Sequence, residues 1–222
     1  MPLSVLDRLL DFDRQASAGL QGLLAGVDEA GRGPLAGPVV AAAVVLHRTG
    51  CLDGLNDSKQ VSPQKREALY SQILQNAAVG IGVVEEDEID RINIYQASRL
   101  AMKIAVFALN LSPALVLTDG TMKIDLPFAQ RSVIKGDAKS ASIAAASIIA
   151  KVIRDARMCE LDLLYPGYGF KKHKGYGTAF HLARLKAIGP SPIHRKSFAP
   201  VANWQRQARP NGPVPDYNEA LS

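Results

Sequence analysis

Short apolar runs separated by polar turns recur along most of the chain, and they alternate with longer stretches in which apolar residues recur at helical spacing. The short runs predict strands over 23–27, 38–46, 78–84, 114–118 and 131–135. The longer stretches predict helices over 62–76, 94–109 and 140–162. Strands that alternate with helices in this way indicate an α/β fold, with a mixed sheet flanked by helices.

The last part of the chain has a different pattern. A loop over 165–170 is followed by a run of lysines, and Thr178 is a suitable N-cap for a short helix that Gly189 and Pro190 end. We therefore expect residues 1–162 to form the α/β core of the protein. Residues 163–204 are expected to form a small basic, helical region packed on that core, and 205–222 a flexible tail.

Charge separates the same two regions. Residues 1–162 hold 17 Lys and Arg against 19 Asp and Glu, whereas residues 163–215 hold 9 Lys and Arg and no acid. Such a basic stretch can follow the backbone of a polyanion, although chance clustering on a solvated face is the alternative. Cys51 and Cys159 lie far apart, which favours a reducing compartment. With neither a signal peptide nor a run of about 18 apolar residues, the sequence predicts a cytoplasmic protein without membrane contact.

Acidic residues follow several of the predicted strands. Asp28 and Glu29 come after the first strand, and Asp119 and Asp137 follow two later ones. Each alone is typical of a surface turn, but repetition at strand ends suggests one shared site. Clustered carboxylates need cations, and hard oxygen ligands suit Mg²⁺ or Mn²⁺, two of which can act together in phosphodiester hydrolysis. Neighbouring strand residues point to opposite faces, so Asp28 and Glu29 can share a site only if the backbone turns or bulges there.

The glycine-rich stretch after the first acids, Gly26 to Val39, resembles the signature of the ribonuclease HII family. The resemblance continues through 56–59, 118–120, 135–137, 142–155, 171–178 and 194–198, and covers about residues 23 to 200. It implies a ribonuclease H-like fold and a Mg²⁺- or Mn²⁺-dependent endonuclease, with two metal ions when substrate is bound. The implied substrates are RNA–DNA hybrids and duplex DNA with single ribonucleotides. We expect incision on the 5′ side of the ribonucleotide, leaving 3′-hydroxyl and 5′-phosphate ends.

The resemblance also implies the roles of individual residues. The family's catalytic and metal-binding acids correspond to Asp28, Glu29, Asp119 and Asp137. Its substrate-reading backbone element corresponds to Gly31, Arg32 and Gly33, and its junction-sensing tyrosine to Tyr176. We expect Lys59, Lys171, Lys172 and Lys174 to contact phosphates, with Arg195 and Lys196 as weaker candidates. His173, His181 and His194 are expected to be structural, and the protein to be a monomer.

Two other functions fit parts of the pattern. Gly31, Gly33 and Gly37 follow a strand, as in a dinucleotide-binding oxidoreductase, but a strand rather than a helix is predicted after them. A non-catalytic binder of hybrids or duplexes would use only the basic stretch. That alternative leaves the acids without a purpose, because they would repel a polyanion.

Overall fold

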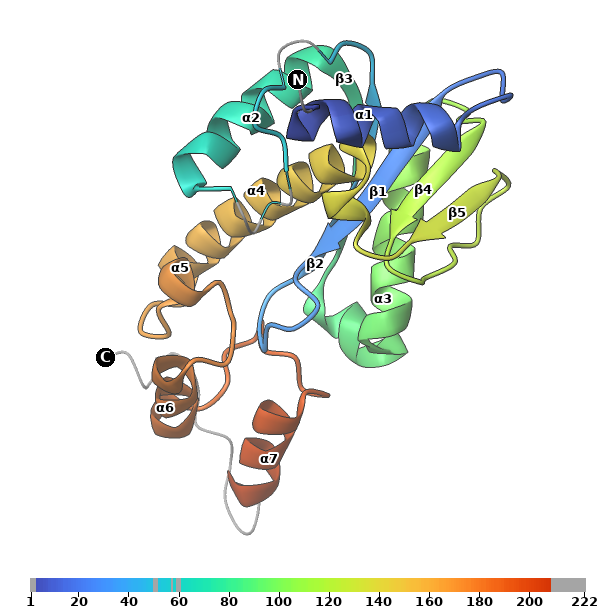
Figure 1. Ribbon diagram of the computed structural model, residues 1–222. Helices are drawn as coiled ribbons and strands as arrows, with labels where there is room; N and C mark the ends of the chain where they lie inside the picture. The colour runs from blue at the N-terminus through green and yellow to red at the C-terminus, as the bar shows by residue number, and fades with distance from the viewer. Residues whose placement is uncertain (1–2, 50–51, 57, 59–60, 209–222) are drawn as a thin grey trace. The chain divides into compact units, whose positions relative to one another are not determined.

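The computed structural model describes residues 3–49, 52–56, 58 and 61–208. The elements in chain order (Figure 1) are α1 (Val5–Ala16), β1 (Leu24–Ala30), β2 (Val39–Leu46), α2 (Pro63–Asn76), β3 (Ala77–Val84), α3 (Glu86–Ala108), β4 (Leu115–Asp119), β5 (Gln130–Val133), the 3-10 turn η1 (Gly136–Ala138), α4 (Ala141–Leu164), α5 (Phe170–His173), α6 (Ala179–Ile188) and α7 (Ala199–Ala208). Strands and helices alternate as predicted, and the α/β fold class is confirmed.

The five strands form one mixed sheet in the order β3-β2-β1-β4-β5. β1 runs antiparallel to β2 and parallel to β4, and β4 runs parallel to β5. In the parallel pair, Val27 lies opposite Thr118, so the next residues, Asp28 and Asp119, reach the same end of the sheet. Because β5 is parallel to β4, its carboxyl end lies at this edge too, and the chain continues from there into η1 and Asp137.

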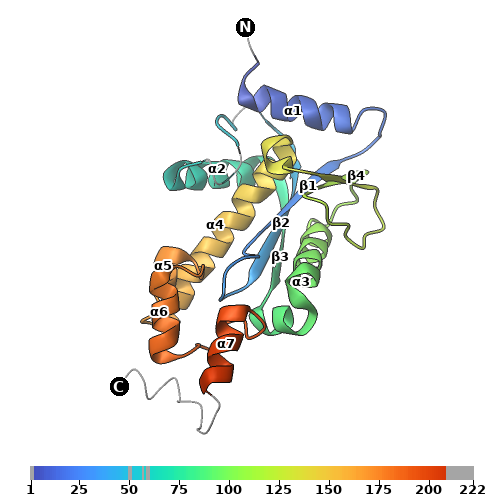
Figure 2. The same cartoon turned by 60° about the horizontal axis from the view of Figure 1, so that its bottom comes forward.

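Each face of the sheet is covered by helices. On one face, Ala42 and Val44 of β2 join a buried cluster with residues of α1, α2 and α4. On the other face, Gly80 and Gly82 of β3 lie against α3, where a Cβ at Gly80 would come within 2.1 Å of the Ala105 carbonyl oxygen. Figure 2 shows α4 and the later half of α3 on opposite sides of the sheet.

Packing divides the chain into two compact units. The first, which holds the sheet, comprises residues 1–30, 40–84 and 98–153, and the second comprises 31–39, 85–97 and 154–222. In the second unit, Tyr168 and Phe170 are fully buried with Met158 and Ile193, which gives this unit an apolar cluster of its own. The second unit thus joins the glycine-rich loop after β1 to the basic C-terminal part of the chain.

Several elements differ from the sequence-based prediction. β1 continues through Asp28 and Glu29 to Ala30, because all three residues pair with β2 in unbroken register. α3 begins at Glu86 and has a kink at Asn93, whose side-chain oxygen accepts from the backbone N–H groups of Tyr95 and Gln96. This cap starts the predicted second half of the helix, whereas the acidic first half was not predicted. Helix α7 was not predicted either.

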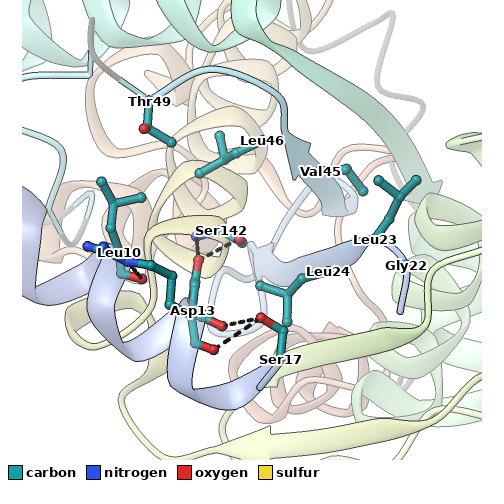
Figure 3. Close-up of a pocket in the computed structure, with 11 residues that line it drawn as sticks. Leu10, Asp13, Ser17, Gly22, Leu23, Leu24, Val45, Leu46, Thr49 and Ser142 are labelled. Carbon is teal, nitrogen blue, oxygen red and sulfur yellow. Dashed lines mark hydrogen bonds between the residues drawn. The ribbon is translucent and has the colours of Figure 1, made fainter. Parts of the chain in front are cut away.

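Asp13 of α1 fixes the start of α4. Its carboxylate accepts from the Ser140 hydroxyl at 2.5 Å, and from the Ser142 backbone N–H at 2.8 Å and hydroxyl at 2.6 Å. A residue remote in sequence therefore satisfies a backbone N–H that the helix start leaves without a partner. Asp13 and Ser142 also line a cavity of about 500 Å³ near α1 and the start of β1 (Figure 3). None of the predicted site residues that the structure describes lines this cavity.

Candidate active site

Three predicted acids converge in the sheet unit. Asp28 of β1, Asp119 at the end of β4 and Asp137 of η1 each offer an oxygen atom, and these atoms all lie within 4.8 Å of one another. Asp28 and Asp137 are buried and Asp119 is partly buried. The Asp119 carboxylate accepts from the Gly136 backbone N–H at 2.6 Å, which ties β4 to the turn that carries Asp137. The convergence follows from three adjacent parallel strands that end at one edge.

Asp28 is the most strongly perturbed member of this group. Burial raises the pKa of its carboxyl well above the ordinary value, and the charges of Glu29 and Asp119 raise it further. Hydrogen bonds from Ser147 of α4 and the Glu29 backbone N–H act in the opposite direction. Ser147 is itself 2.8 Å from the Ser58 hydroxyl, so a short chain of hydroxyl groups supports the carboxylate. A buried carboxylate beside two other acids is stable as an anion only with a cation nearby.

Glu29 stands apart from the three aspartates. Because β1 pairs regularly with β2, with Asp28 opposite Ala42 and Glu29 opposite Ala41, the two acids point to opposite faces of the sheet. No bulge brings them to one face. The group of three oxygen atoms accordingly does not include Glu29, although its charge still acts on Asp28. A role for Glu29 at a metal remains a prediction.

The donor set fits a hard divalent cation. Carboxylate oxygens are the ligands that Mg²⁺ and Mn²⁺ prefer, and three of them lie within 4.8 Å of one another. Among the described residues, no histidine or cysteine belongs to this group. Asp28, Asp119 and Asp137 could therefore hold such a cation, and its charge would offset their mutual repulsion.

The predicted substrate-reading loop lies in the second unit, where two buried arginines hold it. Arg195 donates to the carbonyl oxygens of Gly31, Arg32, Pro34 and Gly37 at 2.6–3.0 Å. Arg154 donates to the carbonyls of Ala36, Pro38 and Lys174 at 3.0–3.3 Å. Burial lowers the pKa of Arg154 to about 10 and that of Arg195 to about 9. The prediction that Arg195 contacts phosphate is wrong, because its side chain is fully buried.

The exposed residues of this unit form its candidate binding surface. Arg32, Gly33, Lys171 and Lys172 are exposed, and Tyr176 keeps 47% of its surface. A Cβ on Gly33 would lie 3.5 Å from the Tyr176 ring, so the loop and the tyrosine are neighbours. The loop is also tied to the segment before Tyr176 by a hydrogen bond from the Leu35 N–H to the Gly175 carbonyl.

The remaining lysines differ in their surroundings. The Lys174 ammonium donates to the Asp155 carbonyl at 3.3 Å and lies 3.0 Å from the Cys159 sulfur, so it is turned toward its own unit. Lys196 lies 3.5 Å from the Asp87 carboxylate. Lys59, a predicted phosphate contact, lies outside the described residues.

Sequence reasoning missed the residues that support the site. Ser58 and Ser147 lie within motifs that carried the family resemblance, but nothing in their spacing indicated a contact with Asp28. Arg154 appeared to be an ordinary charged residue of a long helix. The available signal was its position within a stretch rich in Ala and Ile, where a charged residue needs partners.

Comparisons with known proteins show the family of this chain. The family model described as Ribonuclease HII matches residues 25–201. Ribonuclease HII of Geobacter sulfurreducens is 52% identical over 200 residues, which is 90% of this chain and 92% of the relative. Ribonuclease HII of Enterococcus faecalis is 58% identical over 180 residues, 81% of this chain and 70% of the relative.

Solved structures show the same fold. The crystal structure of ribonuclease H2 from Pyrococcus horikoshii is 27% identical, with a TM-score of 0.71, and the match covers 85% of this chain and all of that one. A structure of Bst-RNase HIII in complex with Mn²⁺ matches with a TM-score of 0.63 at 20% identity, over 90% of this chain and 74% of that one. From the family model, the close relatives and the fold together, the chain belongs to the ribonuclease HII family of type 2 ribonucleases H.

Proposed function

We propose that this protein is an endonuclease that hydrolyses the RNA strand of RNA–DNA hybrids and incises duplex DNA on the 5′ side of a single ribonucleotide. The products are expected to carry 3′-hydroxyl and 5′-phosphate ends. The observation that carries the proposal is the convergence of Asp28, Asp119 and Asp137 in a chain of this family. The acids give the protein a hydrolytic site, which a non-catalytic binder of nucleic acid would not need.

In this proposal, Asp28, Asp119 and Asp137 hold divalent cations, Mg²⁺ or Mn²⁺, with Glu29 as a fourth acid. Bound cations of this kind activate water and stabilise charge on a phosphodiester. The protein's own contribution is to fix the carboxylates. Ser147 orients Asp28, and the Gly136 N–H orients Asp119. Such hydrogen bonds to metal-binding carboxylates commonly tune metal affinity.

The second unit is proposed to read the substrate. The backbone of Gly31 to Gly33 offers hydrogen-bonding groups to a 2′-hydroxyl, the one group that distinguishes RNA from DNA locally. The exposed ring of Tyr176 offers a flat surface for a neighbouring deoxyribose that lacks the 2′-oxygen. Lys171 and Lys172 are placed on the surface where phosphates could reach them. A phosphate contact has less support for Lys174, because its ammonium already donates to the Asp155 carbonyl and the Cys159 sulfur.

The proposal also covers the state of the protein in the cell. No helix in the described part of the chain is both long and apolar enough to cross a membrane. We propose a cytoplasmic monomer, because its substrate would be found with the DNA and each chain supplies the carboxylates and the recognition loop. Light scattering of the purified chain measures this, and a stable dimer would contradict it.

A duplex DNA with one ribonucleotide tests the function directly. We expect one cut on the 5′ side of the ribonucleotide with Mn²⁺ or Mg²⁺, and none after chelation with EDTA. An all-DNA duplex of the same sequence is the matched control and should stay intact. Cutting that continues in EDTA would contradict the metal role, and an uncut ribonucleotide duplex would contradict the proposed function.

Tyr176→Ala is expected to lower cutting at the single ribonucleotide by about fivefold to 150-fold. Contacts of an aromatic ring with nucleic acid are commonly worth about 1–3 kcal/mol, which corresponds to this change in rate. Since the side chain is about half exposed, the melting temperature should change little. Tyr95→Ala removes a similarly exposed tyrosine of α3 and serves as the control. If both variants cut this substrate equally well, Tyr176 has no part in recognition.

A further inference from the structure

Three histidines of the second unit lie in contact beneath Tyr176. The Nε2 atoms of His181 and His194 are 3.0 Å apart, and the ring of His173 stacks on that of His181 with centroids 4.5 Å apart. His181 and His194 are fully buried beside Tyr168 and Phe170. Two imidazole nitrogens at this distance need one hydrogen between them, so the protonation of each ring is constrained.

The outer contacts fix where each proton lies. The backbone N–H of Ser191 can only donate, and it points at Nδ1 of His194 at 2.9 Å, so that nitrogen is an acceptor. His194 then carries its proton on Nε2 and donates it to Nε2 of His181. The carbonyl oxygen of Tyr176 can only accept, and it lies 2.9 Å from Nδ1 of His181. Both rings are thus neutral and in opposite tautomers, and all four nitrogens have partners.

The surroundings favour the neutral forms. Burial lowers the pKa of His181, and it lowers that of His194 to about 3. Among titratable groups, His173 lowers the pKa of both rings, and His181 also lowers that of His194. A second proton on His181 would set its Nε2–H against that of His194 at 3.0 Å, and a second proton on His194 would set its Nδ1–H against the Ser191 N–H at 2.9 Å. The hydrogen bonds therefore all donate in one direction, from the Ser191 N–H through His194 and His181 to the Tyr176 carbonyl.

We propose that His194 and His181 form a neutral hydrogen-bond relay that positions Tyr176 for ribonucleotide recognition, which makes both histidines positioning residues. The inference rests on the proposed function of Tyr176. The relay ends on the Tyr176 carbonyl, which also accepts from the Thr178 N–H at 2.8 Å. His173 holds the residues just before Tyr176. The Gly175 N–H donates to Nδ1 of His173, and the Tyr176 N–H donates to the His173 carbonyl.

The relay fixes the backbone of Tyr176 while leaving its ring exposed. A loop tyrosine that reads a sugar must keep its ring in place without substrate, since small displacements can cost about a hundredfold in rate. Tyr176 lies outside any regular element, between α5 and α6. Hydrogen bonds from both sides of the loop therefore supply the rigidity that a helix or strand would otherwise give.

Nitrogen-15 NMR of the histidine rings tests the relay in the unmodified protein. At pH 7, we expect His194 to show the neutral form with hydrogen on Nε2 and His181 the neutral form with hydrogen on Nδ1. Exposed His47 provides an internal reference signal from outside this group of histidines. Imidazolium signals from His181 or His194 at this pH, or the same tautomer in both rings, would overturn the relay.

Substitution of His181 tests the positioning role. His181→Leu keeps the site apolar but removes the donor to Tyr176, and we expect about a tenfold loss at the single ribonucleotide. His181→Asn can still donate an N–H to the Tyr176 carbonyl and should restore most of the rate. His47→Leu is the control and should cut normally. Rates are compared at a temperature at which circular dichroism shows each variant to be folded.

A double variant separates positioning from general stability. If His181 acts through Tyr176, His181→Leu combined with Tyr176→Ala should be no slower than Tyr176→Ala alone. Losses that multiply would overturn the inference while leaving the proposed function in place. A wild-type protein that does not cut the ribonucleotide duplex would instead remove the proposed function, and with it the role of the relay in recognition.

Discussion

Asp28→Asn is expected to reduce hydrolysis of a ribonucleotide-containing duplex at least about a thousandfold. The substitution removes one negative charge from the three oxygens that are placed to hold a cation, and metal assistance is worth several kcal/mol, with each 1.36 kcal/mol a factor of ten. Asn has nearly the same shape and can still accept from the Glu29 N–H. Single-turnover cleavage in Mn²⁺ measures the loss, and binding of the duplex should persist.

The same variant should be more stable than the wild type when no metal is present. Asp28 is buried and repelled by Glu29 and Asp119, so the charged side chain opposes folding and the neutral amide relieves it. Added Mn²⁺ should stabilise the wild type by about 2.7 kcal/mol when its concentration is a hundredfold above the dissociation constant. This stabilisation is seen as a higher melting temperature. Asp28→Asn should lose this response, whereas exposed Asp53→Asn should keep it. Equal responses to Mn²⁺ would place the ion elsewhere.

The sequence was sufficient to identify the acids but not their arrangement. Asp28, Asp119 and Asp137 each follow or end an apolar run, which indicates a shared edge only if the strands are parallel neighbours. That pairing, with Val27 opposite Thr118, depends on long-range contacts that a linear pattern does not contain. The alternation of side chains along a strand was known in advance, and it correctly signalled that Asp28 and Glu29 cannot share one face without a bulge.

The supporting residues were beyond prediction for a different reason. Arginine side chains are usually exposed, so a sequence-based prediction places Arg195 and Arg154 on the surface. Their actual partners are, apart from the Lys174 carbonyl that Arg154 contacts, carbonyl oxygens of residues 31–38, more than a hundred positions away. Asp13 is a similar case, since it caps a helix that begins 128 residues later. Every residue has backbone groups of the same kind, so the sequence does not show which of them a distant side chain will bind. Such hydrogen bonds are found only from the three-dimensional structure.

Arg195→Met is expected to destabilise the second unit by about 4 kcal/mol and to abolish most nuclease activity. The substitution leaves four carbonyl oxygens without their donor, those of Gly31, Arg32, Pro34 and Gly37, and the contacts to all but Arg32 are buried. Each such group costs roughly 1–3 kcal/mol. Release of the buried charge, whose pKa is lowered to about 9 by burial, offsets part of the loss. Urea unfolding measures the change, and hydrogen exchange at the Leu35 and Gly37 amides locates it.

Arg195→Lys distinguishes loss of charge from loss of geometry. Lysine keeps the positive charge, but its single ammonium cannot span carbonyl oxygens that a guanidinium contacts from three nitrogens, so we expect most of the destabilisation to remain. Arg206→Met removes an exposed arginine of α7 and serves as the control. It should change neither the midpoint of urea unfolding nor the rate of cutting. If Arg195→Lys keeps the wild-type midpoint and exchange rates, charge alone holds the loop. Since Gly31 follows β1 directly in the chain, a loosened loop should lower cutting even where the carboxylates are untouched.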